Sequence, residues 1–230
     1  MPRESKTALK ARALEIARRL EDQYPDATTA LNWRTPWELL VATILSAQCT
    51  DEKVNEVTAD LFRQYPTVED FARADLAALE EQIRPTGFYH NKARSIVGAA
   101  QALLSRFGGE VPRTMQDMLT LPGVARKTAC VVLGTAFGVA EGIAVDTHVS
   151  RLALRMGLTP PQKTKTVNTD KIERDLMALL PQDRWVQFGH CMVWHGRRVC
   201  QAKKPLCPEC VVADLCPKRG VQPAGKPKVP

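Results

Sequence analysis

Apolar residues recur at helical spacing along almost the whole chain, and this periodicity constrains the fold more than any other feature. Leu9, Ala13, Ile16 and Leu20, for example, fall on one face of a helix. No stretch of alternating apolar and polar residues is convincing enough to indicate a strand. The pattern therefore predicts an all-α protein of nine or ten helices packed in bundles, because no internal period indicates a solenoid.

Capping and turn residues mark the ends of several predicted helices. Thr35-Pro36-Trp37-Glu38 combines a Thr cap, a Pro at the first helical position and a Glu that would close a capping box. Thr114 and Asp117 form a second capping pair, and Gly108-Gly109 ends the helix before them. The predicted helices include the apolar positions of residues 9–20, 40–45, 54–62, 76–83, 93–104 and 114–119, the segment after 122–123, and the ranges 147–156, 168–180 and 183–197.

Composition places the chain among ordinary globular proteins. A length of 230 residues suits one large domain or two small ones. Hydrophobic residues make up 44% and charged residues 25%, values that exclude wholesale disorder and a disulfide mini-scaffold. The net charge of +7 indicates a polyanionic partner, although many basic proteins simply have solvated charges.

Neither a secretory signal nor a membrane span is expected. The charged N-terminus, MPRESKTALK, has no apolar run behind it. The longest apolar stretch, 129–145, is short and is interrupted by Glu141 and several glycines. We therefore expect a cytoplasmic protein, in which seven cysteines indicate metal binding or buried thiols rather than disulfides.

Four of the cysteines lie close together near the C-terminus. Cys200, Cys207, Cys210 and Cys216 have the spacing C-x6-C-x2-C-x5-C. Four thiolates this close in sequence can surround one metal centre, because sulfur is a soft ligand for zinc or for an iron–sulfur cluster. Spacing alone does not separate structural zinc from a [4Fe–4S] cluster, and either would cross-link a loop with little apolar core.

Basic residues surround these cysteines and suit contacts to phosphate. They are Arg197, Arg198, Lys203, Lys204, Lys218 and Arg219. The other cysteines, Cys49, Cys130 and Cys191, fall in helical and mostly apolar surroundings, so we expect them in the core.

The segment 119–128, LTLPGVARKT, predicts a short helix, a tight Pro122-Gly123 turn and a second helix. Backbone N–H groups at such a turn can bind a phosphate, although a plain helical connection has the same pattern. Lys127 falls in the first turn of the second helix, where the macrodipole and neighbouring Arg126 both favour the free amine. A free amine can attack an electrophilic sugar carbon and form a Schiff base; the alternative is an exposed surface lysine.

Asp146 opens another predicted helix within Val145-Asp146-Thr147-His148. Capping is an extremely common use of Asp. A carboxylate kept ionised by a helix N-terminus could also stabilise positive charge on a reacting sugar, and the two interpretations are compatible.

Together these residues resemble the endonuclease III family, the bifunctional DNA glycosylase/AP lyases of base-excision repair within the helix–hairpin–helix superfamily. The resemblance covers about residues 6–217 and is specific because several motifs coincide. They are LLVATILSAQCTDEKVN at 39–55, TGFYHNKA at 86–93, LPGVARKTA at 121–129, VDTH at 145–148, and the four cysteines.

The resemblance implies two helical lobes flanking a DNA cleft. A six-helix barrel with the helix–hairpin–helix would span 30–140, and a cluster domain would combine 1–29 with 141–217. Residues 218–230 are expected to form a flexible basic tail.

The family's functional residues carry over to matching positions of this chain. Lys127 would be the nucleophile and Asp146 the catalytic carboxylate, and a [4Fe–4S] cluster would bind Cys200, Cys207, Cys210 and Cys216. The implied DNA-binding residues are Gln48, Phe88, Gly123, Ala125, Arg126 and His148, of which Gln48 and Phe88 would fill the space left by an extruded base.

The implied activity is removal of oxidised pyrimidines from duplex DNA, followed by strand cleavage 3′ to the abasic site through β-elimination. The expected partner is double-stranded DNA that contains damaged pyrimidines or abasic sites. We expect a monomer, associated with the nucleoid.

Three positions depart from the family pattern. The hairpin commonly reads Gly-Val-Gly, whereas this chain reads Gly123-Val124-Ala125. If Ala125 needs a positive φ it costs roughly 1 kcal/mol, and its methyl group could hinder a phosphate, so we expect Ala125→Gly to tighten DNA binding. Phe88 replaces a familiar Leu, which makes a bulkier wedge, and Thr86 stands where a larger aliphatic residue can occur.

Three alternatives compete with this function. A monofunctional adenine-specific mismatch glycosylase of the same superfamily shares the hairpin, the Asp and the cluster, but lacks a lysine like Lys127 and has a further C-terminal domain. A non-catalytic DNA damage-binding protein would not need both Lys127 and Asp146. A zinc-stapled structural module would lack the brown colour of an iron–sulfur cluster.

Overall fold

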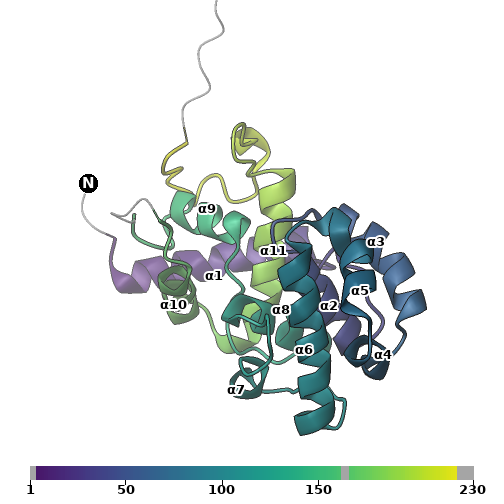
Figure 1. The fold of residues 1–230 in the computed structure, drawn as a ribbon. Helices are drawn as coiled ribbons and strands as arrows, with labels where there is room; N and C mark the ends of the chain where they lie inside the picture. Colours follow the sequence, from purple (N-terminus) through teal and green to yellow (C-terminus); the bar gives the residue numbers. More distant parts are fainter. Residues whose placement is uncertain (1–3, 162–165, 222–230) are drawn as a thin grey trace, which may run out of the picture. The chain divides into compact units, whose positions relative to one another are not determined.

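The computed structural model describes residues 4–161 and 166–221, and these residues form helices, turns and loops without a strand. Eleven α-helices lie in the described ranges, so the all-α prediction is confirmed, and one of these helices was not predicted (Figure 1). The additional helix is α4 (Val68–Ala72). Its signal was a capping box, in which Thr67 Oγ1 accepts the Asp70 N–H at 3.2 Å and the Asp70 carboxylate accepts the Thr67 N–H at 3.0 Å.

The described chain packs as two compact units. The hairpin unit is Thr29–Glu141, and the cysteine unit combines Met1–Thr28 with Gly142–Pro230, as far as these are described. No helix of the described residues is long and apolar enough to cross a membrane.

The hairpin unit is built around α2 (Pro36–Leu45). Nine of the ten residues of this helix are buried, and a helix that is buried on every side forms the centre of a core. The other helices of the unit are α3 (Asp51–Gln64), α4, α5 (Leu76–Ile83), the 3₁₀ turn η1 (Arg84–Thr86), α6 (Tyr89–Phe107), α7 (Met115–Met118) and α8 (Arg126–Phe137). Helix α2 packs against α3, α6 and α8, and α6 also runs along α4 and α5 (Figure 1).

The cysteine unit packs around α11. Its helices are α1 (Lys6–Gln23), α9 (Thr147–Arg155), α10 (Thr169–Leu179), η2 (Gln182–Arg184), α11 (Trp185–Arg198) and η3 (Cys207–Glu209). Helix α11 contacts both α1 and α9. The Arg12 guanidinium on α1 donates to the carbonyls of Met156 at 2.7 Å and Leu215 at 3.0 Å, and so ties α1 to the segment that carries the last cysteines.

Side-chain caps begin most helices of the hairpin unit. Five of its seven α-helices start at a Thr or Asp whose side chain accepts a backbone N–H, namely Thr35, Thr50, Thr67, Asp75 and Thr114. The exceptions are α6, which begins at Phe88, and α8, which begins at Ala125; neither has a side-chain cap. The first-turn N–H groups of these two helices therefore receive no acceptor from their own N-cap residue.

The cap of α2 differs in one detail from its prediction. Thr35 Oγ1 accepts the Glu38 N–H at 3.2 Å as expected. The Glu38 carboxylate, however, accepts the N–H of Arg34 at 2.7 Å instead of the Thr35 N–H. The Arg34 guanidinium binds the same carboxylate at 2.7 Å, which accounts for the shift by one residue.

The segment predicted to be a flexible basic tail, residues 218–230, is described as far as residue 221. The Arg219 N–H donates to the carbonyl of Arg155 at the end of α9 at 3.0 Å, and the Val221 N–H donates to the carbonyl of Lys218 within the segment at 3.1 Å. The first of these bonds ties the start of the segment to α9, and the flexibility of the segment stays a prediction. Residues 222–230 lie outside the described part of the chain.

Candidate active site and metal centre

The hairpin between α7 and α8 turns at Gly123. The Val124 N–H donates to the Leu121 carbonyl at 3.2 Å, and Gly123 has a φ of +74°. A Cβ on Gly123 would lie 2.5 Å from the Cβ of Ser95 on α6. Glycine is required here for its backbone angle and for the close approach of the hairpin to α6.

Ala125 is not strained, which corrects the expectation that it needs a positive φ. It has φ −90° and ψ 167°, an extended conformation that any residue adopts, and it is the N-cap of α8. The cost of roughly 1 kcal/mol assigned to a positive φ does not apply. Only the methyl group remains as a reason for Ala125→Gly to tighten DNA binding.

The N-terminus of α8 has the properties of an anion site. Ala125 supplies no side-chain acceptor at the start of this 12-residue helix, and the macrodipole there favours an anion. Lys127 is the second residue of α8 and is exposed. The Arg126 guanidinium, one residue earlier, donates to the carbonyl of Glu141 at 3.1 Å.

Asp146 is the N-cap of α9 in the cysteine unit. Its Oδ1 accepts the Val149 N–H at 2.8 Å, so the carboxylate is anchored at a helix N-terminus where the macrodipole favours negative charge. His148 lies in the first turn of the same helix, and burial lowers the pKa of its ring. Lys127 belongs to the hairpin unit and Asp146 to the cysteine unit. The contacts described for each residue are therefore contacts within its own unit.

Gln48 and Phe88 share an unusual backbone conformation. Their φ values are +54° and +51°, and Lys218 is the one other non-glycine residue with a positive φ in the described chain. The left-handed region costs roughly 1–2 kcal/mol for such residues, and strain of this kind clusters at functional sites. Both side chains are exposed, and that of Phe88 remains 62% accessible although it is a large apolar group.

The three isolated cysteines were expected in the core. Cys130 and Cys191 are buried as predicted. Cys49 is half-buried and lies in the turn that follows α2, not within a helix, so the prediction is wrong for this residue.

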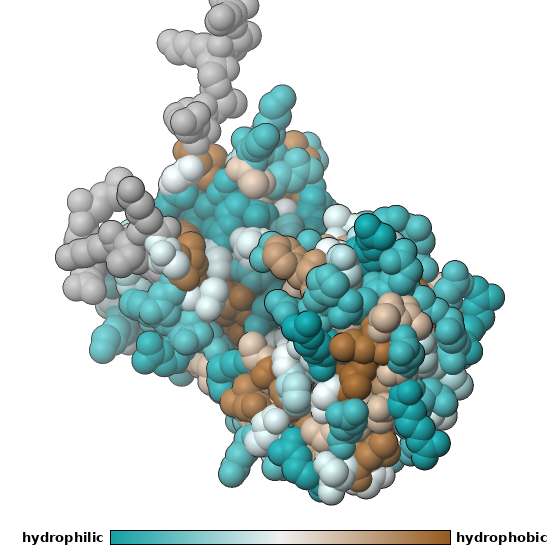
Figure 2. Space-filling view, in the orientation of Figure 1, coloured by the Kyte–Doolittle hydropathy of each residue, from teal (hydrophilic) through white to brown (hydrophobic). Residues whose placement is uncertain are grey.

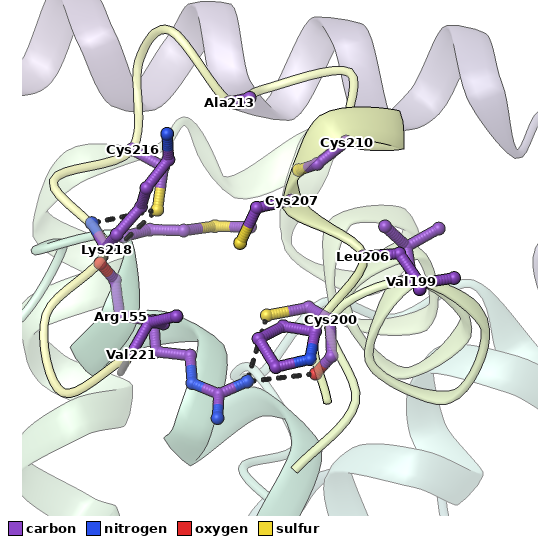
Figure 3. Close-up of a pocket in the computed structure, with 12 residues that line it drawn as sticks. Arg155, Val199, Cys200, Leu206, Cys207, Cys210, Ala213, Cys216, Lys218 and Val221 are labelled. Carbon is purple, nitrogen blue, oxygen red and sulfur yellow. Dashed lines mark hydrogen bonds between the residues drawn. The ribbon is translucent and has the colours of Figure 1, made fainter. Parts of the chain in front are cut away.

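The other four cysteines line one pocket, and their sulfur atoms face the same space (Figure 3). Cys200 follows α11, Cys207 and Cys210 flank η3, and Cys216 lies in the loop beyond. No group of three or more Cys, His, Asp or Glu side chains in the described residues is arranged to hold a single metal ion. Four thiols around a common volume are a donor set that suits an iron–sulfur cluster, because such clusters take thiolate ligands.

Comparison with known proteins adds independent evidence. Residues 41–182 match the HhH-GPD superfamily of base excision DNA repair proteins, and residues 200–216 match the iron–sulfur binding domain of endonuclease III. Endonuclease III of Synechocystis sp. is 54% identical over 208 residues, which cover 90% of this chain and 93% of the relative. Endonuclease III of Escherichia coli K12 is 40% identical over 207 residues, 90% of this chain and 95% of the relative.

The fold agrees with these matches. A solved structure of a trapped endonuclease III–DNA covalent intermediate is 41% identical, with a TM-score of 0.83, over 91% of this chain and 96% of that chain. The chain belongs to the endonuclease III family. It is therefore a base-excision repair enzyme, a bifunctional DNA glycosylase/AP lyase that carries a [4Fe–4S] cluster.

Three of the four cysteine sulfurs have a hydrogen-bonding group close by. Arg155 Nη1 lies 3.4 Å from Cys200 Sγ, and the Lys218 N–H donates to Cys216 Sγ at 3.4 Å. His195 Nε2 lies 3.3 Å from Cys210 Sγ. Such contacts orient the ligands of a cluster and stabilise its negative charge.

His195 connects Cys210 to Tyr24. The ring is 1% exposed, and burial lowers the pKa of His195 to about 4, so the imidazole is neutral at pH 7. Tyr24 Oη lies 3.1 Å from His195 Nδ1. When Cys210 holds the cluster as a thiolate it can only accept, so Nε2 would carry the hydrogen and Nδ1 would accept from the Tyr24 hydroxyl. Sequence analysis missed both residues, because Tyr24 lies far from His195 in the chain.

Some of the basic residues predicted around the cysteines contact other groups of the protein, and others are exposed. Arg198 lies over the rings of Trp194, at 4.1 Å, and Tyr24, at 5.7 Å. Arg219 donates to the Thr159 carbonyl at 3.4 Å. Lys203 and Lys204 are exposed. The face of the molecule drawn in Figure 2 is mostly hydrophilic, with hydrophobic residues scattered over it.

The hairpin geometry predicts a specific loss of stability for Gly123→Ala. Gly138→Ala is the matched control, since Gly138 has a φ of +67° but no atom within 4 Å of the position that an added methyl group would take. Both variants adopt a disfavoured φ, and only Gly123→Ala also contacts Ser95. We expect Gly123→Ala to lower the free energy of unfolding by about 1 kcal/mol or more beyond the control, measured by denaturant titration; equal losses would contradict the close approach.

Arg155 holds the cluster loop through several acceptors, and its replacement should loosen the loop. Its guanidinium also donates to the carbonyls of Gln201 and Ala202, each at 2.7 Å. Arg155→Lys keeps the charge but loses the planar fork, so we expect faster loss of the cluster's visible absorbance when an iron chelator is present. Arg174→Lys, at an exposed position of α10, is the control. If both variants lost the cluster's absorbance at the same rate, Arg155 would not secure the cluster.

Proposed function

We propose that this enzyme removes oxidised pyrimidines from duplex DNA and then cuts the strand 3′ to the abasic site. The observation that carries the proposal is the exposed amine of Lys127 in the first turn of α8, directly after a hairpin whose helix has no side-chain cap. Solved structures of an endonuclease III–DNA complex and of a covalent intermediate, 42% and 41% identical, support DNA as the partner.

The hairpin provides the DNA contact in this proposal. Gly123, Ala125 and Arg126 surround the N-terminus of α8, where a backbone phosphate would meet the positive end of the helix macrodipole. The net charge of +7 strengthens binding at low salt. The hairpin unit would correspond to the six-helix barrel, residues 30–140, and the cysteine unit to the cluster domain.

Gln48 and Phe88 would occupy the helix after the damaged base is extruded. A base inside the stack shields its sugar carbon, so extrusion has to precede chemistry. An apolar side chain inserted into the gap offsets part of the unstacking free energy, on the order of a few kcal/mol. The exposed Phe88 ring suits this role, and His148 would contact the DNA near Asp146.

The chemistry follows from an amine and a carboxylate. The neutral Lys127 amine attacks C1′, and the C1′–base bond breaks with its electron pair leaving on the base. The Asp146 carboxylate stabilises the positive charge that develops on the sugar. The attached nitrogen loses its extra proton, and its electron pair then forms the C1′=N bond as the C1′–O4′ bond breaks and O4′ takes up a proton. The resulting protonated Schiff base acidifies C2′–H, and removal of that proton expels the 3′ phosphate by β-elimination.

The four pocket cysteines would hold the cluster. Cys200, Cys207, Cys210 and Cys216 supply one thiolate each, and burial raises the pKa of the Cys210 and Cys216 thiols, so these two need the metal to stay ionised. When bound, the cluster cross-links a loop that has little apolar core. We further propose that the enzyme is a monomer that acts at the nucleoid.

Borohydride trapping tests the nucleophile. Wild type and Lys127→Ala are compared on a thymine glycol duplex and on an abasic-site duplex. Lys10→Ala, which removes an exposed lysine of α1, is the control for loss of a lysine. We expect a covalent complex on both duplexes with wild type and the control, and none with Lys127→Ala. Trapping that persists in Lys127→Ala would refute the assignment, and trapping of wild type on the abasic site alone would refute the proposed base preference.

Asp146→Asn tests the carboxylate without removing the helix cap. Asn is as good an N-cap as Asp, so the melting temperature should stay close to that of wild type. Loss of the charge should lower the rate of base excision by about 100-fold or more, as for other electrostatic groups at reaction centres. Unchanged single-turnover excision would show that Asp146 acts only as a cap.

A further inference from the structure

Lys92 is the one buried lysine of the described residues, and the function proposed above does not use it. Only 5% of its surface is accessible, although a lysine side chain normally keeps its charged end in water. Burial lowers its pKa, and no carboxylate pairs with it in the described part of the chain. A buried, unpaired ammonium is unfavourable unless its hydrogen bonds are needed elsewhere.

Its ammonium joins two segments that are distant in sequence. Lys92 Nζ donates to the carbonyl of Leu45 at 2.8 Å and to the carbonyl of Thr86 at 2.8 Å. Leu45 is the last residue of α2, and Thr86 is the last residue of η1. A carbonyl at a helix C-terminus has no intrahelical partner and carries partial negative charge, so it is a favourable acceptor for a cation.

Both acceptors stand just before a strained residue. Gln48, with φ +54°, follows Leu45 by three residues, and Phe88, with φ +51°, follows Thr86 by two. The Lys92 N–H also donates to the Phe88 carbonyl at 3.2 Å, in the first turn of α6. The Lys92 side chain therefore holds the backbone just before Gln48 and just before Phe88. Among the described residues of the hairpin unit, these are the only two exposed non-glycine residues with a positive φ.

We propose that Lys92 is a positioning residue that fixes the Gln48 and Phe88 segments relative to each other, so that both side chains enter the DNA together when a base is extruded. The inference rests on the proposed function for the role of Gln48 and Phe88, but the coupling of the two segments is a property of the free protein. Insertion requires both tips at a set separation, because the gap in the base stack has a fixed size. If the two segments moved independently in the free protein, ordering them when DNA binds would cost part of the binding free energy.

Lys92→Met tests this role, because Met keeps most of the aliphatic stem and removes the donors. Arg73→Met, an exposed cation at the end of α4 in the same unit, is the matched control for loss of one charge. Two DNA substrates are used: a duplex with thymine glycol, which requires extrusion, and a single strand with an abasic site, which does not. A 2-aminopurine next to the lesion reports extrusion by its fluorescence.

We expect Lys92→Met to lower duplex excision and the 2-aminopurine signal by about 10- to 100-fold, the loss typical of a misplaced positioning group. Trapping on the single strand should stay at the wild-type level. In the background of Gln48→Ala/Phe88→Ala, adding Lys92→Met should cause little further loss, because the segments it positions no longer insert. Equal losses on both substrates, fully additive losses, or no loss would each overturn the proposal.

Hydrogen exchange tests the coupling without any catalytic readout. The amides of Ala47, Cys49 and Gly87 are hydrogen-bonded within the two segments. In wild type they should open with one shared free energy, and in Lys92→Met they should lose protection together while the Gly109 amide, bonded to Leu103, does not change. Independent opening of the two segments in wild type overturns the proposal even if Lys92→Met does not fold. If wild type forms no covalent complex with DNA, the proposed function is wrong, and the exchange result still decides the role of Lys92.

Discussion

Every helix end leaves backbone groups without an intrahelical partner, and the way this chain satisfies them determines both its packing and its site. Side-chain caps at Thr35, Thr50, Thr67, Asp75 and Thr114 close five helices of the hairpin unit locally. The helices that begin at Phe88 and Ala125 have no such cap, and both coincide with positions implied in DNA binding. Within the described hairpin unit, the two helix starts that lack a side-chain cap are thus both at positions where DNA contact is expected.

Cations satisfy the carbonyl ends in both units. In the hairpin unit, Lys92 binds the last carbonyl of α2. In the cysteine unit, Arg12 and Arg151 bind carbonyls at Met156 and Gly196, and Arg155 binds those of Gln201 and Ala202. These guanidinium contacts and the iron–sulfur cluster hold a loop that a small core could not order alone. Much of the basic charge is therefore structural, which weakens net charge as a guide to DNA binding.

Local patterns in the sequence were sufficient for the fold class and for much of the site. Period and caps predicted all but one helix, and cysteine spacing alone indicated a metal centre. The missed helix, α4, is only five residues long, too short for its apolar period to be visible. The strain expected at Ala125 was wrong because the hairpin uses its positive φ at Gly123 instead. A sequence motif gives the residues of a turn but not which residue takes the unusual angle.

Contacts between distant residues could not be predicted in the same way. The hydrogen bonds of Tyr24 with His195 and of Lys92 with Leu45 span 171 and 47 residues, and no local period encodes such pairs. They become visible only when helices are packed. The sequence therefore predicted individual functional residues, and the structure shows which distant residues support them.

The left-handed backbone at Phe88 limits which side chains can stand there over evolutionary time. Leu, Phe, Met or Asn can adopt this conformation at a modest free-energy cost, whereas Val and Ile crowd their own backbone because they branch at Cβ. Substitution at this position is thus confined to residues that are not branched at Cβ, whatever lesion is being selected for. The volume of the side chain at this position can therefore vary among these residues while the backbone conformation stays the same. Natural substitutions can in this way change the size of the exposed group step by step.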